Sequence, residues 1–281
     1  MREYFCGWYF KCQSSNQALA IIPAIHKSKD HRSCSIQLIT NDGVFNICFP
    51  YDKFCKQKKN FNIDIENNRF SSDGIELCLN TPDCTAVGSL KFGEFSPIKY
   101  DIMGPFRYVP FMECRHTVVS MRHTVTGEIT INGKDYCFDN DLGYIEGDRG
   151  YSFPKEYAWT QCFFENGSLM LSVASIPIGS FFFTGVIGVI VIDKKEYRLA
   201  TYLGAKVRKI EGGEIIIAQR DMSLSVKLIK KQALPLFAPE SGTMSRTIHE
   251  SICCNAAYCF KIGDNTLLSF ETSEASFEYE Y

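Results

Sequence analysis

The 281-residue chain lacks a surplus of charge of either sign. Lys and Arg number 30 and Asp and Glu 32, so the formal net charge is −2. Proteins that bind nucleic acid normally carry a basic surplus that neutralises phosphates, so nucleic acid is excluded as the main partner. The 45% of hydrophobic residues is ordinary for a globular protein, and a chain of this length can bury a core without the help of disulfide bonds or structural metal ions.

Familiar catalytic, metal-binding and export signals are also lacking. No Walker loop, G-x-G-x-x-G or H-E-x-x-H motif occurs. The thirteen cysteines are mostly scattered singly, and "CCNAAYC" (253–259) matches no C-x-x-C finger. The first residues show no charged lead followed by an apolar run. We therefore expect no metal, no cofactor and no disulfide, and mostly buried thiols in a reducing cytoplasm.

Long helical patterns are scarce, and short apolar runs separated by turn signals take their place. Asn132-Gly133 is a two-residue hairpin signal between two such runs. This spacing predicts an all-β fold, an antiparallel meander, with a boundary near residue 160. Residues 231–244, with two prolines and a glycine, are expected to form a loop.

One uncharged stretch, residues 168–192, is long enough to span a bilayer. Pro177 and Gly179 lie in its middle, and β-branched residues dominate its second half. These features favour two buried strands joined by a turn, so no transmembrane segment is expected.

The segment "GYIEGDRGYSFPKEYAWTQC" (143–162) concentrates acidic and aromatic side chains. If its first part is extended, Tyr144, Glu146 and Asp148 share one face and Arg149 points to the other. The next strand would place Tyr157, Trp159 and Gln161 on one face. Were both faces to line one cavity, the cavity would have carboxyl groups at one end and aromatic walls.

Such a cavity suits acid-catalysed addition to an alkene. Burial raises the pKa of a carboxylic acid and keeps it protonated, and aromatic faces stabilise the cation that forms when the proton is given up. Asp148 or Glu146 would be the acid. The alternative is that "EGDRG" is an exposed bend in which Arg149 forms an inert salt bridge.

A second set of polar residues lies in "FMECRHTVVSMRH" (111–123), where alternation puts Glu113, Arg115 and His123 on one face. A buried polar network that fixes the strand pair is the favoured interpretation; supplying an acid or orienting a carbonyl is the alternative. His116 and His123 are seven residues apart, which places them on opposite faces and is no obvious metal pair.

Five segments together resemble the bacterial branch of the tocopherol cyclase family. They are "GWYFKCQ" (7–13), "IIPAIH" (21–26), "GPFRYVPFMECRHTVVSMRHTVTGEITING" (104–133), residues 143–162 and "APESGTMSRTIHES" (238–251). In the central motif Gly147 stands where the family has lysine, and Arg149 where it has tryptophan. The other motif residues match, namely Glu146, Asp148, Gly150, Ser152, Phe153, Pro154, Trp159 and Gln161.

The resemblance implies two lipocalin-like antiparallel β-barrel domains, residues 1–160 and 161–281, that hold an apolar ligand. It further implies a relation in fold to carotenoid hydratases and lipocalin-like pericyclases. The catalytic candidates are Asp148 and Glu146. The candidates for substrate binding are Tyr144, Tyr157, Trp159, Gln161, Arg149, Glu113, Arg115 and His123.

Two functions stay open. The first is a tocopherol cyclase-like enzyme that binds a hydrophobic prenyl or polyene molecule and promotes its cyclisation or hydration through a buried acid. The second is a non-catalytic lipocalin-type binding protein, which needs apolar area and a few polar anchors but no proton donor. The replacements at 147 and 149 favour the second.

Overall fold

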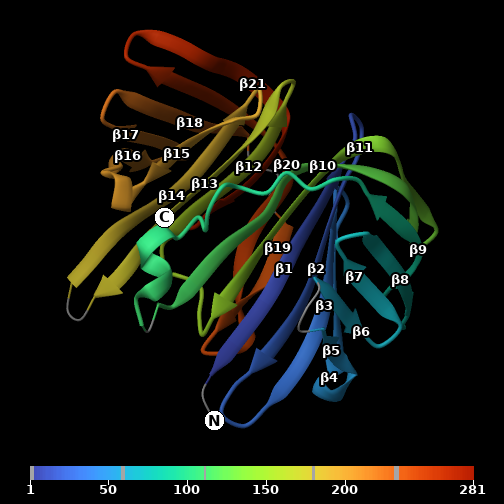
Figure 1. Cartoon of the computed structure of the whole chain (residues 1–281). Coiled ribbons are helices and arrows are strands. Elements are labelled where there is room, and N and C mark those ends of the chain that lie inside the picture. Colours follow the sequence, from blue (N-terminus) through green and yellow to red (C-terminus); the bar gives the residue numbers. More distant parts are fainter. Residues whose placement is uncertain (1–2, 58–60, 111, 179–180, 231–233) are drawn as a thin grey trace. The chain divides into compact units, whose positions relative to one another are not determined.

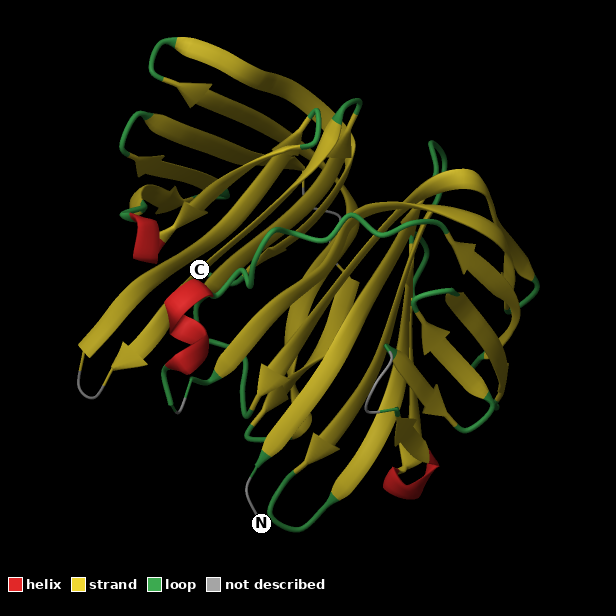
Figure 2. Cartoon of the chain, in the orientation of Figure 1, coloured by secondary structure: helices red, strands yellow, loops and turns green. Residues whose placement is uncertain are grey.

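The structure is a computed structural model of the chain that describes residues 3–57, 61–110, 112–178, 181–230 and 234–281. Most of these residues form strands (Figure 2). The helices of the described part are three short 3-10 turns, η1 (Tyr51–Lys53), η2 (Gly104–Tyr108) and η3 (Thr201–Leu203).

The chain divides into two compact units, each assembled from three segments. Unit 1 comprises residues 1–98, 114–152 and 237–246, and unit 2 comprises residues 99–113, 153–236 and 247–281. The expected division into residues 1–160 and 161–281 stays a prediction.

Unit 1 is built on an eleven-stranded antiparallel sheet, sheet A, with the order β4-β3-β2-β1-β11-β10-β9-β8-β7-β6-β5 (Figure 1). The first strand, β1, pairs with the last, β11. Contacts of β3 with β6 and η1 bring the two edges together into a nearly closed barrel. The strands are β1 (Tyr4–Gln13), β2 (Ala18–Lys27), β3 (Arg32–Thr40), β4 (Val44–Pro50), β5 (Phe54–Lys56), β6 (Asn62–Ile65), β7 (Asn68–Ser71), β8 (Gly74–Asn80), β9 (Thr85–Phe92), β10 (Cys114–Ile131) and β11 (Lys134–Gly150).

Unit 2 is built on sheet B, with the order β15-β14-β13-β12-β21-β20-β18-β17-β16. Its first strand, β12, likewise pairs with the last, β21. The strands are β12 (Tyr157–Phe164), β13 (Gly167–Ile178), β14 (Phe181–Ile192), β15 (Lys195–Ala200), β16 (Lys206–Glu211), β17 (Glu214–Gln219), β18 (Met222–Lys230), β20 (Thr243–Ile262) and β21 (Asn265–Tyr279). In each sheet the fourth strand is followed by a 3-10 turn. The expected all-β fold of lipocalin-like antiparallel barrels is confirmed.

The hairpin between β10 and β11 forms at the expected turn. Asn132 and Gly133 both adopt positive φ, 49° and 82°, as a type I′ turn requires. The uncharged stretch 168–192 forms the paired strands β13 and β14, so the expectation of two strands is confirmed; residues 179 and 180 of its turn lie outside the described residues. None of the helices in the described part is long and apolar enough to cross a membrane.

The loop expected over residues 231–244 is wrong for most of its length. Strand β19 (Leu234–Glu240) forms there and pairs with β20, whereas residues 231–233 lie outside the described residues. A strand that pairs on one side tolerates proline. The Gln37 amide holds the strand: its Nε2 donates to the Phe237 carbonyl at 3.1 Å, and its Oε1 accepts from the Phe237 N–H at 3.3 Å.

Strand β1 is buried on both faces, and this positions the polar residues of unit 1. Trp8, Phe10 and Cys12 belong to the apolar interior of the barrel. Alternation therefore places Tyr9, Lys11 and Gln13 on the opposite face, where they are also buried. Polar side chains thus lie in a water-poor environment outside the apolar interior.

In unit 2, Arg198 fastens the segment 99–113 to strand β15. The guanidinium forms a buried ion pair with Glu196, lies 3.5 Å from the centre of the Tyr100 ring, and donates to the carbonyl oxygen of Asp101 at 3.3 Å. The Glu196 carboxylate accepts the Lys99 N–H at 2.9 Å. This clamp orders the segment of chain that precedes β10.

We expect Arg198→Met to lower the free energy of unfolding by about 3–5 kcal/mol, because it leaves the buried Glu196 carboxylate without its ion-pair partner. Urea unfolding followed by circular dichroism measures the change. In the control, Lys209→Met, the lost ion pair with Glu214 is largely exposed, so at most about 1 kcal/mol is expected. A loss for Arg198→Met no larger than the control's contradicts the clamp.

Candidate functional site

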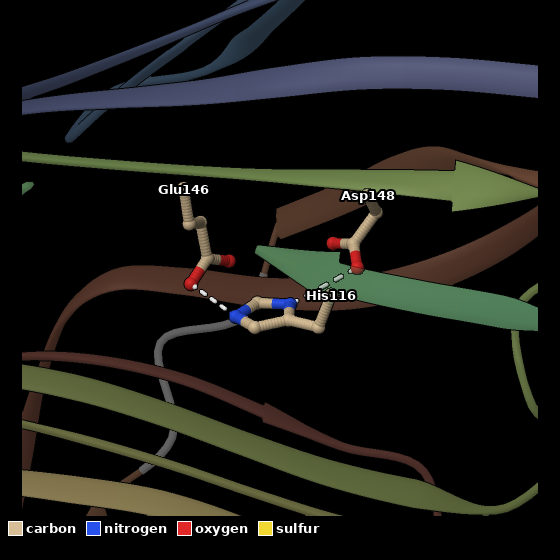
Figure 3. Close-up of side chains that lie close together, drawn as sticks. All are labelled: His116, Glu146 and Asp148. Carbon is tan, nitrogen blue, oxygen red and sulfur yellow. Dashed lines mark hydrogen bonds and ion pairs between the residues drawn. The ribbon is translucent and has the colours of Figure 1, made fainter. Parts of the chain in front are cut away.

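Strands β10 and β11 bring one histidine and two carboxylic acids together (Figure 3). His116 lies directly opposite Asp148, and Val118, two residues further along, lies opposite Glu146. Residues two apart on a strand share a face, so the imidazole reaches both acids. Its Nδ1 lies 3.0 Å from Asp148 Oδ1, and its Nε2 lies 3.1 Å from Glu146 Oε2.

The surroundings of this triad are largely closed to water. Glu146 is 5% exposed and His116 8%, whereas Asp148 is partly exposed. The fully buried Tyr144 donates its hydroxyl to Glu146 Oε2 at 2.5 Å, and the Cys114 thiol donates to Asp148 Oδ1 at 3.3 Å. Each carboxyl is therefore held by a neighbouring donor as well as by the imidazole.

The triad holds a proton on its imidazole. Burial alone would lower the pKa of His116, but the adjacent carboxylates of Glu146 and Asp148 outweigh it and raise that pKa well above its ordinary value. Burial, together with the Glu146 carboxylate, raises the pKa of Tyr144 well above its ordinary value, so Tyr144 stays a neutral hydrogen-bond donor. The result is an imidazolium between two carboxylates, next to a phenol.

The same three residues offer one ligand atom each within 4.8 Å of one another, a spacing that could hold a metal ion. A metal would need a ring nitrogen of His116 with its lone pair directed at the ion. Both ring nitrogens instead face carboxylate oxygens. Without an ion, the imidazolium supplies the positive charge between the two carboxylates.

The sequence-predicted residues of β11 lie as alternation requires. Tyr144, Glu146 and Asp148 share the face that carries His116, and Arg149 is exposed. The "EGDRG" stretch is the end of a central strand rather than an exposed bend. At Gly147, a Cβ would lie 3.0 Å from the Trp8 ring, so the indole occupies the space that a side chain would need.

The three polar residues predicted on strand β10 and just before it lie in different surroundings. The His123 ring packs between Phe92 and Phe95, with ring centres 4.7 and 4.8 Å away, and its Nδ1 lies 3.1 Å from Ser120 Oγ. Glu113 precedes β10 and belongs to unit 2, whereas Arg115 lies opposite Arg149 in unit 1. His123 therefore contacts aromatic residues of unit 1, and the polar network that joins it to Glu113 and Arg115 stays a prediction.

The aromatic residues predicted for the next strand lie in unit 2. Ala158 and Cys162 of β12 belong to the apolar interior, so Tyr157, Trp159 and Gln161 share the other face and are buried there. Tyr157 donates its hydroxyl to Glu278, and Trp159 lies opposite Glu278 in the β12–β21 pair. Their role as walls around Glu146 stays a prediction.

Two residues of the unit 1 face were missed. The spacing of His116 from His123 indicates only an unconvincing metal pair, although His116 joins both predicted acids. Lys11, in the quoted segment "GWYFKCQ", is 0% exposed. A charged residue flanked on both sides by apolar ones in a short strand was the available signal.

No protein-family model matches the sequence, and no curated protein does either. Solved structures share the fold, among them the following three. The crystal structure of CghA with Sch210972 has a TM-score of 0.62 at 10% identity, over 99% of this chain and 88% of that one. Kievitone hydratase from Nectria haematococca has 0.56 at 8% identity, over 99% and 89%. A protein from Nitrosomonas europaea has 0.54 at 9% identity, over 100% and 93%. The resemblance to the tocopherol cyclase family stays an interpretation.

We expect folding to raise the pKa of one buried histidine of unit 1 and to lower the pKa of two others. His116 should be protonated at pH 7 and above, because of its two carboxylate neighbours, whereas burial lowers the pKa of His26 and of His123 to about 4. Nitrogen-15 NMR of the imidazoles, with each histidine assigned by substitution, measures the three charges. A neutral His116 at pH 7 contradicts the charge assignment of the triad.

Stability should follow the same titration. Because the pKa of His116 is raised on folding, its contribution is complete below the unfolded value of about 6.5 and is lost as the pH rises through the folded value. We therefore expect the difference in stability between the wild-type chain and His116→Gln to shrink from pH 6 upward. Urea midpoints measured across the alkaline range test this, and a difference that grows with pH contradicts it.

Proposed function

We propose that this protein is an enzyme that protonates an alkene of an apolar small molecule and so promotes its hydration or cyclisation, in the manner of a tocopherol cyclase-like protein. The observation that carries the proposal is the buried imidazolium between Glu146 and Asp148. It stores a transferable proton on a face largely shielded from water. The fold supports the proposal, since one protein that shares it is a hydratase and another was crystallised with a small molecule.

The triad residues and Tyr144 have different roles in this reaction. The imidazolium of His116 passes its proton to the carboxylate of Glu146 or Asp148, and that carboxyl group gives the proton to one carbon of the alkene, which leaves His116 neutral. Tyr144 keeps the Glu146 carboxyl in place through its hydroxyl. A carbocation forms at the other alkene carbon, and the negative charge left on the triad stabilises it.

The outcome depends on what captures the cation. Water attack followed by loss of one proton gives an alcohol, so the net reaction adds one water to the alkene. Attack by an oxygen or an alkene of the same molecule, with loss of one proton, closes a ring without changing the composition. In both cases the released proton returns to the triad, and no redox step is involved.

The second candidate is a binding protein without chemistry. It is favoured by the fact that both ring nitrogens of His116 already face carboxylates, as in a self-contained structural network. Arg149, in place of the family's tryptophan, is consistent with this, because it replaces an aromatic side chain with a cation. In this case His116, Glu146 and Asp148 only fix β10 to β11.

Turnover of polyprenyl phenols and polyenes separates the two candidates. We expect the wild-type chain to convert at least one of them, and Asp148→Asn, Glu146→Gln and His116→Gln each to lower kcat by about 100-fold or more, since general acid catalysis contributes that much. Product formation is measured by chromatography and mass spectrometry.

The matched control is Arg69→Gln, which removes an exposed ion pair with Asp64 and should leave turnover unchanged. Melting curves with each compound report binding separately, because a ligand that binds the folded state raises the melting temperature. Binding without turnover by the wild-type chain supports the second candidate and contradicts catalysis. Full activity in all three triad variants contradicts the proton-donor role.

A further inference from the structure

The hairpin of strands β13 and β14 extends beyond the strands that flank it in sheet B. The β12–β13 ladder ends at Ala174, and the β14–β15 ladder ends at Ile187. Past these points the two strands continue as a two-stranded ribbon, residues 176–178 and 181–185, whose strands pair with each other. Figure 1 shows the ribbon reaching out from sheet B. Among the described strands of sheet B, none continues the ladders along this end of the hairpin.

The ribbon exposes large aromatic side chains on both of its faces. Phe181 is 77% exposed and Phe182 is 71% exposed. Adjacent residues of a strand point to opposite faces, so the two rings lie on opposite sides of the ribbon. The sequence carries no charged residue from Ser168 to Ile192. The ribbon therefore presents apolar surface to its surroundings on both sides, and this surface is unfavourable in water.

A third exposed aromatic residue belongs to the 3-10 turn η2 beside the ribbon. Phe183 of the ribbon contacts Phe106 of η2, with ring centres 6.0 Å apart. Tyr108, the last residue of η2, is 78% exposed, and the guanidinium of Arg107 lies 5.2 Å from the centre of its ring. We call Phe181, Phe182 and Tyr108 the aromatic tip of unit 2.

The corresponding hairpin of unit 1 shows that the strand order does not require an aromatic tip. Strands β2 and β3 take the place in sheet A that β13 and β14 take in sheet B. They have 10 and 9 residues, whereas β13 and β14 have 12 each. Their connection carries the charged residues Lys27, Lys29, Asp30 and Arg32. Unit 2 thus has a longer hairpin, with phenylalanines where unit 1 has charges.

The two-sided exposure favours a lipid bilayer over a folded protein as the partner of the aromatic tip. A folded partner presents one surface, so it would cover one face of the ribbon and leave the ring on the other face in water. The interfacial layer of a bilayer surrounds a protruding ribbon and takes up the rings of both faces. The hydroxyl of Tyr108 and the guanidinium of Arg107 suit the headgroup level of that layer.

The backbone of the ribbon limits how deep it can enter a bilayer. The outer edges of its two strands carry N–H and C=O groups beyond the ends of the β12–β13 and β14–β15 ladders. Such groups are costly in the hydrocarbon core, where neither water nor headgroups can bond to them. The ribbon therefore suits the interface of a bilayer rather than a path across it.

We infer that the aromatic tip anchors unit 2 to the surface of a phospholipid bilayer by inserting Phe181 and Phe182 into its interfacial layer. The anchor is apolar, so binding persists at high salt, in contrast with binding by surface charges. The inference does not rest on the proposed function, because a bilayer without any ligand is sufficient for the binding.

Flotation with vesicles of dioleoyl phosphatidylcholine tests the anchor. We expect the wild-type chain to float with the vesicles at low and at high salt. Phe181→Ser/Phe182→Ser should lower the partition coefficient about tenfold or more, because two rings no longer leave water. The matched control is Val87→Ser/Leu267→Ser, which removes two exposed apolar side chains from strands β9 and β21 and should float as the wild type does.

Three results overturn the inference. The first is a wild-type chain that stays in the soluble fraction, including the case in which sedimentation shows that the aromatic tip joins two copies of the chain. The second is flotation of Phe181→Ser/Phe182→Ser at the wild-type level. The third is flotation of the wild-type chain that is lost at high salt, since this assigns the binding to charged residues.

A second variant keeps an aromatic side chain at the tip and reports its depth. The two native tryptophans, Trp8 and Trp159, are buried, so vesicle-induced changes in the emission of Phe181→Trp report on the tip. We expect the emission to shift to shorter wavelength on addition of vesicles. Lipids brominated near the headgroup should quench it more than lipids brominated near the chain end. An unchanged emission overturns the insertion, and stronger quenching from the chain end overturns the interfacial position.

Discussion

The imidazole of His116, held between the carboxylates of Glu146 and Asp148, is the interaction on which the unit 1 face depends. Two acids on one buried strand face would repel each other and lose their hydration. A protonated imidazole within 3.1 Å of both supplies the opposing charge. The imidazolium pairs with both acids at once, so this face can be closed to water while the two carboxylates keep their charge. The proton that makes this possible is the one on His116.

Much of unit 1 follows from the sequence. Asn132-Gly133 fixes the turn between β10 and β11, and strict alternation from Tyr144 to Asp148 correctly places three candidate residues on one face. These features are local, because a turn dipeptide and a strand period are each decided by a few adjacent residues. The same local logic predicts the β13–β14 hairpin in the uncharged stretch.

The position of His116 does not follow from the sequence, because it depends on bulges. Counted outward from the Asn132-Gly133 turn, where Ile131 pairs with Lys134, a regular ladder would set His116 opposite Arg149. Register shifts between Val118 and Ser120, Ser120 and His123, and Val125 and Gly127 move the partner by one residue, to Asp148. A bulge leaves no reliable signal in a single sequence, yet here it decides which charge the imidazole meets.

The strand order that the two units share does not by itself produce the triad of His116, Glu146 and Asp148. In both units the first strand pairs with the last, and an aromatic residue of the first strand lies opposite a buried glutamic acid of the last strand. In unit 1, Tyr9 lies opposite Glu146, and the hydroxyl of Tyr144 donates to Glu146. In unit 2, Trp159 lies opposite Glu278, and the hydroxyl of Tyr157 donates to Glu278. The difference lies in the neighbouring strand. Opposite Glu146 stands Val118, with His116 two residues away, whereas opposite Glu278 stands Glu250. Both units thus present a buried acid at the same place in the strand order, and His116 on β10 makes the acid of unit 1 part of a charged triad.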